Sequence, residues 1–277
     1  MAGFLKGVFG QRRTAASSDP DRGAVTGTAP RILSLKQMPA AVYAIGDAHG
    51  CNALYRKLEH DIVNDAEASG ITGPKLIVVL GDFVDRGPDS AGLLRHLLDP
   101  PPPGFQRVVL RGNHEDMMLA FLQDPAPARQ WLHFGGTETL VSYGMHPDPE
   151  HGFARPVRHL KQMLDATIPA AHREFLTKLP YGLSVGGYFL CHAGIDPARS
   201  LAHQRPEDLL WGGGDKIDAA AGTFPVIVHG HVITEDVLLT SKRINVDTGA
   251  YESGKLSAVR LVEDMPPIVL SVGGIPV

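Results

Sequence analysis

Residues 41–50, Ala-Val-Tyr-Ala-Ile-Gly-Asp-Ala-His-Gly, decide the fold of this chain. Five apolar residues predict a buried strand, and Asp47 and His49 follow it directly, between two glycines. The same order returns in residues 76–87, Leu-Ile-Val-Val-Leu-Gly-Asp-Phe-Val-Asp-Arg-Gly, and in residues 107–115, Arg-Val-Val-Leu-Arg-Gly-Asn-His-Glu. Longer amphipathic stretches separate these runs. That alternation is typical of an α/β protein.

The remaining apolar runs of the chain predict further strands in the sheets. The C-terminal third has closely spaced strands without long helices, so we expect antiparallel pairing there and two stacked mixed sheets with helices outside. Residues 130–175 are predicted to form a helical insertion, interrupted by the Gly- and Pro-rich residues 144–152. We predict strands at 41–45, 76–80, 107–110, 188–191, 226–228, 244–246, 256–261 and 268–272, and helices at 52–68, 89–98 and 114–123.

Composition excludes several other classes of protein. The 277 residues carry 26 basic and 30 acidic side chains, a net charge of −4, so no general attraction to nucleic acid or to anionic membranes is expected. No apolar run reaches the eighteen residues of a membrane span. Two cysteines cannot form a disulfide framework, which favours a reducing compartment, the cytoplasm. Residues 1–30 are rich in Gly, Ala, Ser, Thr and Pro and are predicted to be a flexible tail.

Polar clusters stand where five of the predicted strands end, and the carboxyl ends of strands are where α/β sheets bind ligands. The metal-binding groups in them are two carboxylates, one amide and three imidazoles: Asp47, Asp82, Asn113, His49, His192 and His231. Mixed oxygen and imidazole donors suit Mn, Fe or Zn. Six donors exceed one tetrahedral ion and fit two ions that share a carboxylate. Arg86 and Arg111 beside such a cluster predict a phosphoryl group between them.

These motifs resemble the phosphoprotein phosphatase branch of the dinuclear metallophosphoesterases. Its signature, Gly-Asp-x-His-Gly, Gly-Asp-x-x-Asp-Arg-Gly and Gly-Asn-His-Glu, is complete here and in order. The resemblance covers residues 41 to about 262 and implies a metallophosphatase catalytic domain over residues 31–277. Bacterial serine/threonine protein phosphatases and symmetrical diadenosine tetraphosphatases are the most similar groups, and residues 208–211, Asp-Leu-Leu-Trp, fit them too. Ile233 stands where many relatives outside this branch carry a further histidine ligand.

The resemblance also implies a role for each site residue. Asp47 and His49 would hold the first metal, Asp82 would bridge both metals, and Asn113, His192 and His231 would complete the second. His114 matches the family's general acid and Asp85 the aspartate that orients it, and Arg86 and Arg111 match its phosphate contacts. His229 would face the same side as His231 and is an alternative ligand, although the family pattern matches His231.

Two divalent ions, most simply Mn²⁺, would generate a bridging hydroxide that attacks phosphorus in line, without a phosphoenzyme. His114, kept protonated by Asp85, would protonate the leaving alkoxide. The expected substrate is phosphoserine or phosphothreonine in a protein, or another phosphorylated molecule. A dinucleotide polyphosphate hydrolase is the first alternative, and the insertion at 130–175 is the surface expected to discriminate. A non-catalytic, metal-poor binding module is the second alternative, disfavoured because the ligand set is complete.

Several neighbouring residues receive lesser roles. Related bacterial enzymes carry an arginine where this chain has Gly213, so Arg205 or Lys216 could replace its phosphate contact. Asp247-Thr248-Gly249 resembles a turn near the substrate, with Tyr251 just beyond, but neither Asp247 nor Tyr251 is predicted to be catalytic. The remaining aromatic and sulfur-containing side chains are interpreted as packing, namely Trp131, Trp211, Met117, Met118, Cys51 and Cys191. None of these features specifies the oligomeric state.

Overall fold

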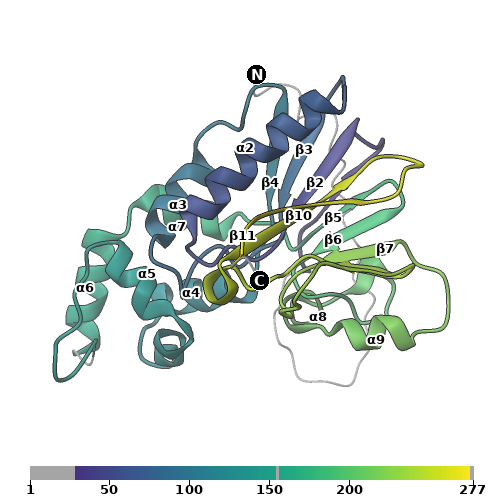
Figure 1. Cartoon of the computed structure of the whole chain (residues 1–277). Coiled ribbons are helices and arrows are strands. Elements are labelled where there is room, and N and C mark those ends of the chain that lie inside the picture. The colour runs from purple at the N-terminus through teal and green to yellow at the C-terminus, as the bar shows by residue number, and fades with distance from the viewer. Residues whose placement is uncertain (1–28, 154–155, 275–277) are drawn as a thin grey trace.

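The computed structural model describes residues 29–153 and 156–274, and most of the predicted tail, residues 1–28, lies outside this range. Two β-sheets stack on one another, and helices cover their outer faces (Figure 1). The predicted α/β sandwich is therefore confirmed. Its strands are β1 (Ile32–Leu35), β2 (Ala41–Ile45), β3 (Lys75–Val79), β4 (Phe105–Val109), β5 (Gly182–Val185), β6 (Tyr188–Cys191), β7 (Val226–His229), β8 (Leu238–Leu239), β9 (Arg243–Asn245), β10 (Lys255–Leu261) and β11 (Ile268–Gly273).

Long helices follow the early strands, and short ones follow the late strands. The helices are α2 (Asn52–Ala68), α3 (Ser90–Leu98), α4 (Asn113–Gln123), α5 (Gly136–Ser142), α6 (Val157–Thr167), α7 (Ala170–Thr177), α8 (Pro206–Trp211), α9 (Gly214–Ala219) and α10 (Ala250–Ser253), with 3-10 turns η1 (Arg129–Phe134) and η2 (Leu201–His203). The segment predicted as an insertion contains η1, α5, α6 and α7, and α6 projects away from the sheets (Figure 1). No helix in the described part of the chain is long and apolar enough to cross a membrane.

Register in the five-stranded sheet places the functional loops side by side. Its order is β11-β10-β2-β3-β4, with β2, β3 and β4 parallel. Ile45 pairs with Val79, and Val79 pairs with Val109, so these three strands end level with one another. The loops that follow them therefore start from one edge of the sheet, as the sequence predicted.

The six-stranded sheet corrects part of the prediction. Its order is β1-β5-β6-β7-β9-β8, and β6–β7 and β7–β9 pair in parallel, where antiparallel pairing was expected. Parallel neighbours need a long crossover. Residues 192–225, with α8 and α9, supply one, and residues 230–242, with β8, supply the other. Three strands were not predicted: β1 and β5 at one edge and the two-residue β8 at the other.

Alternating side chains divide the core into layers. In β2, Val42 and Ala44 pack between the two sheets, whereas Tyr43 and Ile45 pack in the cluster that includes α2 and α3. A third cluster joins Phe189 and Ile227 of the six-stranded sheet to α8 and α9. Two-residue periodicity in strands produces this division. Because each sheet is packed on both faces, the strand ends are held rigidly.

Candidate active site

All six predicted metal-binding residues converge at the carboxyl ends of the strands. Asp47 and His49 follow β2, Asp82 follows β3, and Asn113 opens α4 after β4. His192 and His231 follow β6 and β7 of the other sheet. Two groups of mutually close ligand atoms result, one formed by His49, Asp82 and His114 and the other by Asp82, His192 and His231, with all atoms of a group within 4.8 Å of one another. Asp82 belongs to both groups.

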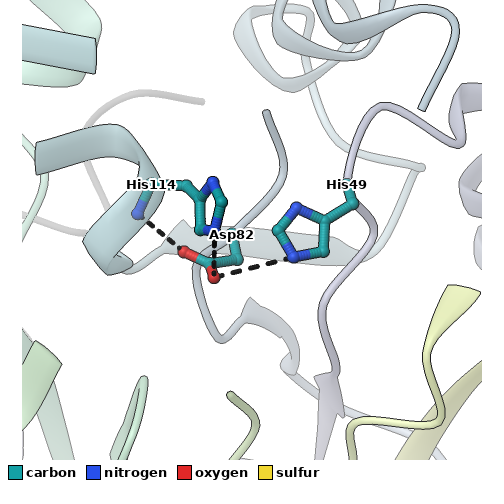
Figure 2. Close-up of side chains that lie close together, drawn as sticks. All are labelled: His49, Asp82 and His114. Carbon is teal, nitrogen blue, oxygen red and sulfur yellow. Dashed lines mark hydrogen bonds and ion pairs between the residues drawn. The ribbon is translucent and has the colours of Figure 1, made fainter. Parts of the chain in front are cut away.

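Figure 2 shows the first group, with the imidazoles of His49 and His114 facing the Asp82 carboxylate. His49 Nε2 lies 3.7 Å from Asp82 Oδ2. The other ring nitrogen of His49, Nδ1, lies 2.8 Å from the Val84 carbonyl, to which it donates. Burial lowers the pKa of His49 to about 3, so the ring is neutral at pH 7. A neutral ring held this way presents Nε2 as a lone pair, the arrangement of a metal-ligating histidine.

In the second group, His192 faces three acceptor atoms at once. Its Nδ1 lies 3.2 Å from the Leu80 carbonyl, and the Asp82 carboxylate raises the pKa of His192 although burial works against the charged form. His192 Nε2 lies 2.7 Å from Asn113 Oδ1, 3.2 Å from His231 Nδ1 and 3.3 Å from Asp82 Oδ2. Burial lowers the pKa of His231 to about 4, so this ring is neutral, like that of His49. A set of lone pairs that converge in this way fits a cation.

Asp47 adds an unsatisfied oxygen to the centre. Its Oδ2 accepts the His231 backbone N–H at 3.0 Å, whereas its Oδ1 is buried without any hydrogen-bond partner. Burial and the nearby carboxylates of Asp247 and Asp82 raise the pKa of Asp47 well above its usual value. An uncompensated carboxylate is costly in a buried site. A bound cation would remove that penalty, so the residues fit a metal centre.

Asp82 is the common element of the centre. Burial alone would raise its pKa, but the imidazoles of His192 and His114 hold it well below the usual value. The Asp82 Oδ1 atom accepts the backbone N–H of His114 at 3.0 Å, and Oδ2 faces the histidines. The carboxylate is therefore ionised and orients one oxygen toward both ligand groups.

His114 and Asp85 form a hydrogen-bonded pair beside the metal-binding groups. His114 Nδ1 donates to Asp85 Oδ2 at 2.6 Å, and His114 Nε2 lies 3.9 Å from Asp82 Oδ2. Burial opposes the charged form of His114, but Asp82 and Asp85 outweigh it and raise its pKa. This geometry suits a histidine that delivers a proton from Nε2.

Arg86 stands at the wall of a cavity of about 120 Å³. Its two terminal nitrogens lie 3.2 Å from His49 Nε2 and 3.2 Å from His114 Nε2, and its guanidinium packs 4.7 Å from the centre of the Tyr251 ring. Arg86 is the one arginine or lysine, among the described residues, that lines this cavity. The full lining is His49, Asp82, Arg86, Asn113, His114, Met117, Phe134, Trp211 and His231.

Arg111 is the predicted site residue that does not converge. Its terminal nitrogens donate to Asp116, to the Tyr181 hydroxyl and to the carbonyls of Leu176 and Thr177. It lines a different hollow, between residues of α4 and α7. Arg111 therefore does not line the cavity beside Arg86, and its phosphate contact stays a prediction. Its guanidinium closes the carboxyl end of α7, where carbonyl oxygens lack helical partners.

Hydrogen bonds hold Arg205 and His229 away from the two ligand groups. Arg205 donates to Asp208 at 2.8 Å and 3.2 Å, and neither Arg205 nor Lys216 lines the cavity, so neither replaces the arginine absent at Gly213. His229 is fully buried, with Nδ1 2.9 Å from the Gly230 carbonyl and Nε2 3.4 Å from Arg243. It belongs to neither ligand group, and its contacts with the Gly230 carbonyl and Arg243 are those of a structural residue.

Several residues interpreted as packing belong to the site. Trp211 and Met117 line the cavity, and Trp211 lies edge-on to His231 with ring centres 5.9 Å apart. Trp131 donates its indole N–H to Asp85 Oδ2 at 2.7 Å. Glu115 accepts backbone N–H groups from Asp82, Phe83, Val84 and Gly112 at 2.8 to 3.2 Å, which ties two of the loops together. The Gly-Asn-His-Glu motif was the available signal for Glu115, but no sequence pattern marked Trp131.

Fold and site together define a metal-dependent phosphoester hydrolase. The family model of the calcineurin-like phosphoesterases matches residues 40–253, and the chain belongs to that family. It is 24% identical to serine/threonine-protein phosphatase 2 of Escherichia coli, covering 79% of this chain and 92% of that protein. It is also 24% identical to an asymmetrical bis(5'-nucleosyl)-tetraphosphatase of Bacillus velezensis, covering 79% and 88%. A crystal structure described as that of a diadenosine tetraphosphatase has a similar fold, with a TM-score of 0.60 and 20% identity over 89% of this chain and 99% of that one.

Proposed function

We propose that this hydrolase cleaves phosphomonoesters, with phosphoserine and phosphothreonine in proteins as its substrates. The observation that carries the proposal is the composition of the small cavity, where four of the six metal-binding residues face one space with Arg86 and His114. The four are His49, Asp82, Asn113 and His231. One guanidinium can hold one phosphoryl group through two parallel N–H donors. A chain of four phosphates would need several more cationic side chains, and no other arginine or lysine of the described residues lines the cavity.

Two divalent ions fit the donor set, and Mn²⁺, Fe or Zn suits its mixture of oxygen and imidazole. Asp47, His49 and Asp82 would hold one ion, and Asp82 would share in the second, together with Asn113, His192 and His231. When bound, such ions activate water and offset phosphate charge. The orphaned Oδ1 of Asp47 and the crowded lone pairs around His192 support this assignment.

The chain's own residues would bind the phosphoryl group and protonate the leaving group. Arg86 would hold the equatorial phosphate oxygens with its planar fork of N–H donors. As the phosphorus–oxygen bond to the leaving group breaks, the proton on His114 Nε2 would pass to the leaving oxygen. Asp85 would keep His114 in the required orientation through the 2.6 Å hydrogen bond to Nδ1.

The surface beside the cavity favours a protein substrate. An apolar hollow of about 410 Å³ shares Met117 and Phe134 with the cavity and continues along α4 and η1. No arginine or lysine of the described residues lines it, whereas Ala120, Ala128 and Trp131 do. Such a hollow suits an uncharged side chain beside a phosphorylated residue and offers nothing to further phosphates. Both cysteines are free thiols, and we place the reaction in the cytoplasm.

A dinucleotide polyphosphate is the second candidate substrate. Phe134 and Trp211 line the cavity and are 42% and 52% exposed, so their rings are available to stack on nucleobases. The names of several relatives, tetraphosphatases among them, point the same way. We rank this substrate second, because a single guanidinium, that of Arg86, lines the cavity.

A substrate panel tests the proposal. The full chain, loaded with Mn²⁺, is offered phosphoserine, phosphothreonine and phosphotyrosine peptides and diadenosine tetraphosphate at matched concentrations, with Asp82→Asn as the inactive control. We expect kcat/KM for the first two peptides to exceed that for the dinucleotide by about tenfold or more, or ~1.4 kcal/mol. The reverse ranking would select the dinucleotide. Hydrolysis of no substrate despite bound metal would select a binding module.

A further inference from the structure

The Asp85 carboxylate receives hydrogen bonds from more side chains than the family motif accounts for. It is fully buried, and its Oδ2 accepts from both His114 Nδ1 (2.6 Å) and Trp131 Nε1 (2.7 Å). Its Oδ1 accepts from Thr139 Oγ1 at 2.7 Å. The Asp85 backbone N–H lies 2.8 Å from the same hydroxyl and 3.0 Å from Ser90 Oγ. Trp131 and Thr139 belong to η1 and α5, outside the loops that carry the metal-binding residues.

Donors on both oxygens fix the plane of this carboxylate. A carboxylate held by His114 alone could rotate about its Cβ–Cγ bond, and the imidazole would turn with it. Because Trp131 holds Oδ2 and Thr139 holds Oδ1, the carboxylate has one orientation. His114 Nε2 then points into the cavity, 3.2 Å from Arg86 Nη2.

The backbone of the same turn is held by the same segment. Asp85 and Arg86 have φ values of +74° and +67°, a left-handed conformation that non-glycine residues rarely adopt. The Arg86 backbone N–H donates to the Gly135 carbonyl at 3.2 Å. Gly135 lies between Trp131 and Thr139, and a Cβ on it would meet the Arg86 nitrogen at 2.5 Å. Residues 131–139 therefore form a brace across this turn.

We propose that Trp131 and Thr139 are positioning residues, which aim Asp85 so that His114 delivers its proton to the leaving group. This inference rests on the proposed function, in which His114 is the general acid. Trp131 is 2% exposed and Thr139 is fully buried, and neither lines the catalytic cavity. Their effect on the reaction passes through Asp85.

Three substitutions in the full, Mn²⁺-loaded chain test the brace. Thr139→Val removes the hydroxyl at nearly constant volume, Thr139→Ser restores it, and Trp131→Phe removes the indole N–H but keeps an aromatic ring. Thr137→Val is the matched control, because the Thr137 hydroxyl binds the Leu132 carbonyl and not Asp85. Each variant is assayed with a phosphoserine peptide, whose alkoxide needs a proton, and with p-nitrophenyl phosphate, whose nitrophenolate does not.

We expect Thr139→Val and Trp131→Phe to lower kcat for the phosphopeptide by about 10-fold to 100-fold, part of the full effect of a general acid. The loss on p-nitrophenyl phosphate should stay within about threefold, with bound metal unchanged. KM for the phosphopeptide should also stay unchanged in Thr139→Val, because Thr139 lines neither the cavity nor the adjacent hollow. Thr139→Ser should recover most of the phosphopeptide rate, and Thr137→Val should alter neither rate. A purely structural role for the brace would reduce both rates together.

His114→Asn separates failure of this inference from failure of the proposed function. If the unsubstituted chain hydrolyses neither ester, or if His114→Asn loses both rates equally, the proposed general acid is wrong. If His114→Asn shows the leaving-group effect and the two brace variants do not, the brace is refuted. Thermal unfolding checks each variant. Thr139→Val and Trp131→Phe act on different oxygens of Asp85, and kcat at saturating phosphopeptide separates the effect on His114 from any loss of peptide binding at the hollow that Trp131 lines.

Discussion

Gly230 offers a test of the metal centre by the addition of one methyl group. This residue lies between His229 and His231 just after β7, and an added Cβ would stand 2.0 Å from Asp47 Oδ1. Cβ contacts in folded proteins do not fall below 3.0 Å, so Gly230→Ala requires a relative displacement of about 1 Å. The backbone has little freedom to move, because the Gly230 N–H donates to the His192 carbonyl at 2.8 Å. Asp47 must move instead.

That displacement would move Asp47 Oδ1, the buried oxygen without a hydrogen-bond partner that we assign as a metal ligand. A misplacement of about 1 Å in a catalytic group lowers rates by about 10²-fold, and loss of support around a ligand weakens metal affinity by about 10-fold to 100-fold. We therefore expect Gly230→Ala to need about 10 to 100 times more Mn²⁺ for half-maximal activity. At saturating Mn²⁺, kcat should remain about 10²-fold low.

The assay combines metal analysis with a Mn²⁺ titration of p-nitrophenyl phosphate hydrolysis. Gly187→Ala is the matched control, since a Cβ there meets no atom within 4 Å. Circular dichroism and thermal unfolding of the metal-free chains confirm that both variants fold. A folded Gly230→Ala chain with unchanged Mn²⁺ dependence and a kcat within twofold of the original would refute Asp47 Oδ1 as a ligand atom.

Three further predictions follow from the structure. Chelation should abolish hydrolysis and Mn²⁺ should restore it, and full activity in a chain proven metal-free by elemental analysis would contradict the metal centre. Arg86→Lys should raise KM about tenfold, whereas Arg111→Lys should leave KM unchanged and lower the unfolding temperature by a few degrees; steady-state kinetics and thermal unfolding check both. Burial works against ionisation of Glu59, but His96 and Arg107 outweigh it and lower the pKa of Glu59 in the folded chain. The ionised carboxylate therefore stabilises the fold fully above its pKa in the unfolded chain, near 4.3. This stabilisation is lost as the pH falls through the lower pKa of the folded chain. Glu59→Gln should therefore reduce the unfolding free energy by about 2 kcal/mol at pH 7 and much less near pH 3, as measured by denaturant titration; an equal loss at both pH values would exclude the charge effect.

The early half of the fold was predictable because its signals are local. Residues 41–45 and 52–68 form β2 and α2 with the predicted bounds. The spacing of their apolar residues, and the glycines and polar residues between the two segments, specify these bounds directly. Pairing direction in the later half was not predictable from strand spacing. The connection of residues 230–242 is just long enough for a parallel crossover, and the two-residue β8 within it has no periodic signal.

The site residues show the same contrast between local sequence signals and contacts that only the tertiary fold creates. The metal-binding residues follow strands, and parallel register brings strand ends together, so their convergence could be expected from the sequence. Arg111 has the same sequence signal as Arg86, yet Arg111 meets the carboxyl end of α7, about 65 residues later in the chain. Trp131 has the sequence signal of an ordinary core residue. Only the tertiary fold brings its indole N–H to Asp85.

Backbone conformation explains why this centre needs so rigid a frame. Six non-glycine residues of the described chain have positive φ, and five of them are site residues: His49, Asp82, Asp85, Arg86 and His231. Each such residue costs about 1–3 kcal/mol and persists only where its surroundings impose it. Here the imposed bonds join separate loops, as when the His49 N–H donates to the Asp82 carbonyl at 2.9 Å. The packing of both sheets therefore maintains the strained turns, and a substitution that loosens the strand ends should impair the site before it unfolds the chain.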